Sequence, residues 1–111
     1  MTERMLAARA ALFGACAVLL TAPAALGQDS VLVERGRAVY TESGCYGCHT
    51  LGKTGTPIGP DLTAIGARYG REFFQAWLRD PANVRAHARM PQLELSESQL
   101  EALAEFLSSL R

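Results

Sequence analysis

Outside its N-terminal region, the chain first shows apolar residues at helical spacing between positions 31 and 41. One face of this predicted helix carries Leu32, Gly36, Val39 and Tyr40. A glycine in mid-helix costs helix stability, so Gly36 on this face indicates that another backbone comes close. The pattern therefore predicts a first helix that packs tightly on a second element.

Two more helices are predicted further along the chain. Residues 71–79 form the first of them, and the Asp80-Pro81 pair ends it. The other begins after Ser96, because Ser96 and Gln99 have the spacing of a capping box. Their apolar faces are predicted to consist of Phe73, Phe74, Trp77 and Leu78 and of Leu100, Leu103, Ala104, Leu107 and Leu110.

The segments between these helices show neither helical nor alternating periodicity. Residues 50–59 are predicted to be a loop of Gly, Thr and Pro, and a single turn from Pro60 through Ile65 follows, with Gly66 as its stop. Residues 85–92 form a second polar loop, which contains Met90-Pro91. Helices with no predicted strands and no internal repeat indicate an all-α fold.

The N-terminal segment has the plan of a secretory signal peptide. Arg4 and Arg9 precede an almost wholly apolar run, residues 10–20, and small residues with Pro23 follow it. The apolar run is short for a bilayer span, and Pro23 interrupts it near its end. A cleaved signal peptide is therefore favoured over a retained membrane anchor.

Cleavage of this segment is predicted after Gly27, with a cut after Ala25 as the alternative. The signal peptide is then residues 1–27, and residues 28–111 are one domain exported to the periplasm. No stable membrane insertion is expected after cleavage. A lipoprotein anchor at Cys16 is disfavoured, because apolar sequence continues past this residue.

Composition narrows the function classes. The 111 residues include 11 basic and 11 acidic side chains, which excludes the strongly basic face of a nucleic-acid binder. A small exported domain has little core of its own and commonly relies on disulfides, a metal or a cofactor. Cys45 and Cys48 are the cysteines that remain after the predicted cleavage, and a sequence motif already involves both.

That motif is Cys45-Tyr46-Gly47-Cys48-His49, which supplies two thiols and an imidazole at the spacing used to attach a c-type haem. The thiols can reach the two vinyl groups on one porphyrin edge, and His49 then comes under the iron as an axial ligand. The expected cofactor is therefore one covalently bound haem c, held by Cys45, Cys48 and His49.

Two other sites also use a pair of cysteines at this spacing. A zinc site would need two further ligands, and the chain offers only His87 as another histidine and no second cysteine pair. A redox dithiol belongs in an alternating pattern of strands and helices, which this sequence lacks. The histidine directly after Cys48 favours haem over both alternatives.

From Gly36 to Leu110 the chain resembles the class I cytochromes c, the monohaem electron carriers, and in particular their small bacterial members. In that family a glycine and an aromatic residue of the first helix cross an aromatic residue of the last, and Gly36, Tyr40 and Phe106 stand at those places. The resemblance implies a small all-α cytochrome c fold of three to five helices wrapped around one covalent haem, with the first and last helices crossing.

The resemblance also implies roles for two loops. Gly59-Pro60 matches the family's short loop whose proline carbonyl accepts a hydrogen bond from the proximal histidine, which makes Pro60 a cofactor-binding residue and orients His49. Met90-Pro91 matches the loop that carries the distal ligand. The implied iron ligands are His49 and Met90.

His87 is the alternative distal ligand, since it lies only three residues before Met90. Met90 is favoured because its soft sulfur suits reduced iron and because Pro91 holds it in an extended conformation before it binds. Charged neighbours indicate that His87 is an exposed loop residue. Filling both axial positions leaves no open site for catalysis on the iron.

The predicted function is that of an exported monohaem c-type cytochrome that transfers single electrons between redox proteins, with no turnover of its own. Its partners are an electron donor and an electron acceptor, and it is a monomer or a subunit of a complex. The alternative function is that of a haem c relay subunit within a larger oxidoreductase. A haem-based gas sensor would need a labile distal ligand and an output domain.

Overall fold

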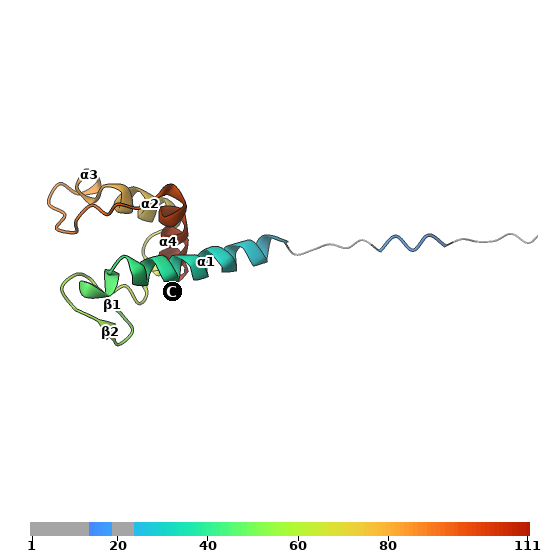
Figure 1. Cartoon of the computed structure of the whole chain (residues 1–111), viewed down its shortest axis with the longest axis horizontal. Coiled ribbons are helices and arrows are strands. Elements are labelled where there is room, and N and C mark those ends of the chain that lie inside the picture. The colour runs from blue at the N-terminus through green and yellow to red at the C-terminus, as the bar shows by residue number, and fades with distance from the viewer. Residues whose placement is uncertain (1–13, 19–23) are drawn as a thin grey trace, which may run out of the picture.

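Helix α1, Ala24–Glu42, and helix α4, Glu97–Ser109, cross each other at the centre of the fold (Figure 1). The computed structural model describes residues 14–18 and 24–111. A methyl group on Gly36 would collide with the Ala102 carbonyl and with Phe106 Cβ, so the two backbones touch where the first helix lacks a side chain. Tyr40, one turn further on, meets Phe106 edge to face at 5.6 Å between ring centroids. The predicted crossing of the first and last helices is confirmed.

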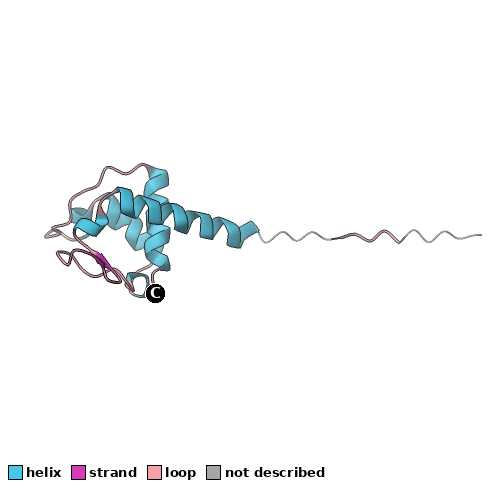
Figure 2. Cartoon of the chain, turned by 60° about the horizontal axis from the view of Figure 1, so that its bottom comes forward, coloured by secondary structure: helices cyan, strands magenta, loops and turns pink. Residues whose placement is uncertain are grey.

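Helix α2, Arg71–Arg79, also packs on α4 and shows the bounds predicted from its periodicity. Phe74 and Leu78 point into the core, whereas Phe73 and Trp77 stay half-exposed. Asp80 then caps the short helix α3, Pro81–Val84, whose proline stands in the first turn. Figure 2 shows that helices form most of the molecule. The all-α fold class is confirmed.

Helix α4 begins as its capping box predicts. The Ser96 hydroxyl accepts a hydrogen bond from the Gln99 backbone N–H, and the Gln99 side chain accepts one from the Ser96 backbone N–H. Its inner face supplies the largest share of the core. The buried hydrophobic side chains are Val39, Tyr40, Ile65, Phe74, Leu78, Leu100, Ala102, Leu103, Ala104, Phe106 and Leu107.

The structure differs from the sequence-based prediction between residues 50 and 67. The predicted loop contains a two-stranded antiparallel hairpin, β1, Thr50–Leu51, and β2, Thr54–Gly55. The predicted turn from Pro60 through Ile65 is wrong, because the helical turn is the 3-10 helix Ile65–Ala67. Gly66 does not stop it but lies inside it, where its N–H donates to the Leu110 carbonyl at 2.7 Å.

The first helix also begins earlier than predicted, at Ala24 rather than at position 31, and so runs through the predicted cleavage point after Gly27. Most of the predicted signal peptide, residues 1–13 and 19–23, lies outside the described residues. Within the described part of the chain, no helix has the length and apolar character needed to cross a membrane.

Candidate functional site

The two cysteines lie in the turn that follows α1. Gly44 adopts a left-handed conformation (φ 77°) that redirects the chain, and the 3-10 helix Cys45–Gly47 follows it. The His49 backbone N–H donates to the Cys45 carbonyl at 2.9 Å, which closes the turn. The motif therefore presents two thiols and an imidazole from one compact turn.

The two thiols differ in environment. Cys45 is half-buried against the hydrophobic core and Cys48 is exposed, and both are free. Burial raises the pKa of the Cys45 thiol, a hydrogen bond from its own backbone N–H to the sulfur lowers it, and the charge of Cys48 raises it. Cys45 is therefore held as the neutral thiol, the form whose S–H can add across a vinyl group.

The orientation of His49 is fixed by the loop that carries Pro60. The Nδ1 atom of His49 lies 2.7 Å from the Pro60 carbonyl oxygen. A carbonyl can only accept, so Nδ1 carries the proton and Nε2 keeps its lone pair for a metal. Gly59 leaves room for this contact, because a Cβ there would lie 2.6 Å from the Cε1 atom of the ring.

Asp61 holds this loop against the hairpin. One of its carboxylate oxygens accepts hydrogen bonds from the Thr50 hydroxyl, the Thr63 hydroxyl and the Thr63 backbone N–H, at 3.1, 2.6 and 3.1 Å. These bonds, with those from Thr63 the largest cause, lower the pKa of the Asp61 carboxyl. Since Thr50 follows His49 directly, Asp61 fixes the two ends of the His49–Pro60 contact relative to each other.

Met90 lies on the loop between α3 and α4, half-buried against the same core cluster that Cys45 contacts. Figure 1 places this loop and the cysteine-bearing turn at the same end of the molecule. The Nε1–H group of Trp77 donates to Met90 Sδ at 3.1 Å. His87 is exposed, as predicted for the alternative ligand.

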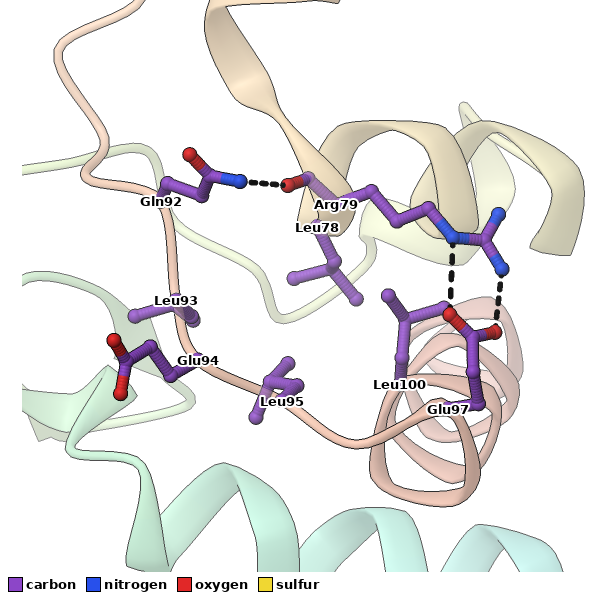
Figure 3. A pocket seen from close by; sticks show the side chains of 8 residues that line it. All are labelled: Leu78, Arg79, Gln92, Leu93, Glu94, Leu95, Glu97 and Leu100. Carbon is purple, nitrogen blue, oxygen red and sulfur yellow. Dashed lines mark hydrogen bonds and ion pairs between the residues drawn. The ribbon is translucent and has the colours of Figure 1, made fainter.

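Gln92, two residues after Met90, fastens the loop to α2, and α2 is in turn joined to α4. The Gln92 side-chain amide donates to the Arg79 carbonyl at 3.0 Å, and the Arg79 guanidinium pairs with the Glu97 carboxylate at 2.6 Å (Figure 3). The ion pair raises the pKa of Arg79 and lowers that of Glu97. Both side chains of this ion pair face solvent, so it contributes little to stability.

A buried hydroxyl lies behind the cysteine-bearing turn. Tyr40 is only 1 % exposed, and its hydroxyl has no hydrogen-bond partner among the described residues. Burial, with smaller effects from Cys45, Tyr46 and Asp61, raises the pKa of Tyr40 to about 12. Tyr40 is therefore neutral at physiological pH and adds no charge beneath the motif.

The donor set fits a haem better than a closed metal site. Two thiols, an imidazole with a free Nε2 and a thioether on a separate loop match the two attachment points and two axial positions of a c-type haem. Hydrophobic periodicity could not show that Asp61, Trp77 and Gln92 support the site through hydrogen bonds. The Asp-x-Thr spacing after Pro60 is the one local signal among them, since it is typical of a side-chain-capped turn.

Comparison with known proteins agrees with this geometry. The family model described as Cytochrome c matches residues 33–111. Cytochrome c oxidase subunit 2 of Alkalihalophilus pseudofirmus is 38 % identical over 89 residues, which are 72 % of this chain and 26 % of that protein. A nitric oxide reductase subunit from Stutzerimonas stutzeri is 37 % identical over 81 residues, 68 % of this chain and 56 % of the relative.

A further relative is a nitric oxide reductase subunit from Cereibacter sphaeroides, 29 % identical over 99 residues, or 81 % of this chain and 65 % of the relative. The chain thus spans between about a quarter and two thirds of the length of these three relatives.

Proposed function

The chain belongs to the cytochrome c family, and we propose that it acts as an exported monohaem protein that passes single electrons from one redox protein to another. Family membership identifies the cofactor as covalently bound haem c and the chain as an electron carrier. A zinc site or a redox dithiol at these cysteines is therefore no longer favoured. The observation that carries the proposal is the His49–Pro60 contact beside two free cysteines, since it leaves one nitrogen ready to bind iron.

Cys45 and Cys48 are proposed to hold the haem covalently. Each thiol would add across one vinyl group of the haem, with its sulfur on one carbon and its hydrogen on the other, so the attachment would need no leaving group. Two bonds from one compact turn fix the position of the porphyrin edge relative to α1.

His49 is proposed to be the proximal ligand, through Nε2. Pro60 accepts the Nδ1 proton and so fixes both the tautomer and the plane of the ring. Gly59 keeps the space beside the ring open, and Asp61 holds the loop in place. The haem iron supplies a reversible one-electron change between its ferrous and ferric states.

Met90 is proposed to be the distal ligand in preference to His87. Its sulfur is held by Trp77 and packs on the core, whereas the His87 side chain is exposed. A soft thioether stabilises reduced iron, so a histidine and methionine pair suits transfer at a comparatively high potential. With His49 and Met90 both bound to the iron, no coordination position would stay open, and electrons would pass by outer-sphere transfer.

The assignment of Met90 is tested by spectroscopy of the oxidised holoprotein. Wild-type protein and His87→Ala are expected to show the weak sulfur-to-iron absorption band near the red end of the spectrum, and Met90→Ala to lose it with a fall in potential. A wild-type spectrum without that band, changed by His87→Ala but not by Met90→Ala, would make His87 the ligand.

Export to the periplasm is supported by the charged, apolar and small-residue regions of residues 1–27. The predicted cleavage after Gly27 can be read directly from the N-terminal sequence of the protein purified from its native host. A mature N-terminus at Gln28, or at Leu26 for the earlier cut, supports export. An N-terminus at Met1 in a cytoplasmic fraction refutes it.

A second candidate function is electron relay as a subunit of a larger oxidoreductase, which the names of the relatives favour. Both functions use the same haem-binding fold, and they differ in what the protein is attached to. Size-exclusion chromatography of a native extract, followed by haem staining, separates them. Elution at the mass of a monomer supports a free carrier, and constant co-elution with a larger enzyme supports the relay role.

A further inference from the structure

The Asp61 carboxylate is the centre of a hydrogen-bond network that joins the hairpin to the loop after Pro60. Its Oδ1 atom accepts from the Thr50 hydroxyl at 3.1 Å, from the Thr63 hydroxyl at 2.6 Å and from the Thr63 backbone N–H at 3.1 Å. The Thr63 hydroxyl in turn accepts from the Gly52 backbone N–H at 2.8 Å. The carboxylate is therefore held in one place, although it faces solvent.

This network lies beside the contact between His49 and Pro60. Thr50 follows His49 in the chain, and Asp61 follows Pro60. The bond between Thr50 and Asp61 and the bond between His49 Nδ1 and the Pro60 carbonyl therefore join the same two segments. The Asp61 carboxylate is thereby fixed next to the bond that orients the proposed proximal ligand.

The negative charge of Asp61 has no cationic partner, because none of the ion pairs among the described residues includes it. Hydrogen bonds, with those from Thr63 the largest cause, lower the pKa of the Asp61 carboxyl, so it is ionised at neutral pH. The charge also acts inside the fold, since it is one of the smaller causes, after burial, that raise the pKa of Tyr40 to about 12.

The capping of a loop does not by itself require this charge. An asparagine side chain has an oxygen at the same place and can accept the same three hydrogen bonds. Aspartate adds a full negative charge, which its donors hold in position. Ferric iron carries one more positive charge than ferrous iron, so a fixed negative charge nearby stabilises the oxidised state.

We infer that the negative charge of Asp61, fixed beside the bond between His49 and Pro60, lowers the reduction potential of the haem-loaded protein. This inference rests on the proposed role of His49 as the proximal ligand. The charge acts on the iron and on the Nδ1–H group of the imidazole, which is more positive when the ring is bound to ferric iron. Because the carboxylate is exposed, dissolved ions screen the part of this interaction that passes through solvent.

Three variants separate the charge of Asp61 from its position. Asp61→Asn removes the charge and keeps an oxygen that can accept the three hydrogen bonds. Thr63→Val removes the shortest of these bonds and keeps the charge. Glu101→Gln is the control for net charge, because it removes one negative charge from the exposed surface of α4.

The measured quantities are the reduction potential and the unfolding free energy of the haem-loaded full chain. Both are measured at about 0.01 M and about 1 M salt, over which the Debye length falls from about 30 Å to about 3 Å. Asp61→Asn is expected to raise the potential, and the rise is expected to shrink at the higher salt concentration. Thr63→Val is expected to lower the unfolding free energy with a smaller change in potential, and Glu101→Gln to leave the potential unchanged.

An unchanged potential in Asp61→Asn would overturn the inference while leaving His49 as the ligand. Equal rises in Asp61→Asn and Glu101→Gln would assign the effect to net charge, and equal rises in Asp61→Asn and Thr63→Val would assign it to the position of the loop. Either result would also overturn the inference. A His49→Ala protein with the wild-type absorption spectrum would remove His49 as the ligand and the inference with it.

Discussion

The imidazole Nδ1 of His49 lies 2.7 Å from the carbonyl oxygen of Pro60, which joins the end of the cysteine motif to a loop eleven residues further on. This bond determines which ring nitrogen carries the proton, and hence which one can bind iron. Gly59 makes the approach possible, because the ring occupies the place where a side chain would begin.

Gly59→Ala is therefore expected to displace the His49 ring. The new Cβ would lie 2.6 Å from Cε1 and 2.9 Å from Nδ1, so the ring or the loop must move. Chemical denaturation of the holoprotein should show a loss of about 1–3 kcal/mol, together with a shift of the His49 ring signals in NMR. Gly70→Ser is the control, since a Cβ there meets Glu72 at an ordinary 3.5 Å. Equal stability of the two variants would contradict this account of the loop.

Gly36→Leu is expected to destabilise the fold severely without breaking the bonds between haem and protein. The side chain would be driven into the Ala102 carbonyl and Phe106, where α1 and α4 touch. We expect a loss of about 3 kcal/mol or more, measured by thermal or denaturant unfolding with the haem stain retained. Ala38→Leu, on the exposed side of the same helix, should change little. If Gly36→Leu melted at the wild-type temperature, α1 and α4 would not touch at Gly36.

The sequence predicts the helices and their contacts correctly where the spacing within one element matches the way that element packs. The face with Gly36, the helix of residues 71–79 and the capping box at Ser96 all followed from spacing within a single element. It failed for the turn predicted to begin at Pro60, because the Asp61 carboxylate caps a loop against Thr50 instead of starting a helix.

The early start of α1 was missed because residues 24–30 show no apolar face at helical spacing. The contact of Gln92 with Arg79 and that of Trp77 with Met90 join segments thirteen residues apart. Such contacts leave no periodic signal, since they depend on how whole elements pack.

Gln92→Ala is expected to loosen the Met90 loop selectively. It removes the bond to the Arg79 carbonyl but leaves the core untouched. The oxidised holoprotein should bind added imidazole faster in place of the proposed ligand Met90, by a factor of about 5 if one hydrogen bond of about 1 kcal/mol is lost. Arg79→Gln is the matched control, because it breaks the exposed ion pair with Glu97 and keeps the carbonyl. Similar imidazole kinetics in wild type and Gln92→Ala would show that the loop is held elsewhere.

Asp61 gives the site an acid-sensitive support. The pKa of the Asp61 carboxyl is lower in the folded protein than in the unfolded chain. Its contribution to stability is therefore fully present above the unfolded pKa of about 3.9. That contribution is lost as the pH falls through the folded pKa. Asp61→Asn cannot titrate and should lose less stability than the wild type on acidification. Unfolding free energies at pH 7 and near pH 3 measure the difference. An equal loss of unfolding free energy in the wild type and in Asp61→Asn would mean that other carboxylates account for the acid sensitivity.

Covalent attachment of haem at Cys45 and Cys48 is the central claim, and haem staining after denaturing electrophoresis tests it most directly. The band of the purified wild-type protein should stain, because thioether bonds survive unfolding, and its mass should exceed that of the mature chain by one haem. Cys48→Ser should keep at most a single thioether bond. Exported wild-type protein that shows no stain and contains zinc would contradict the account.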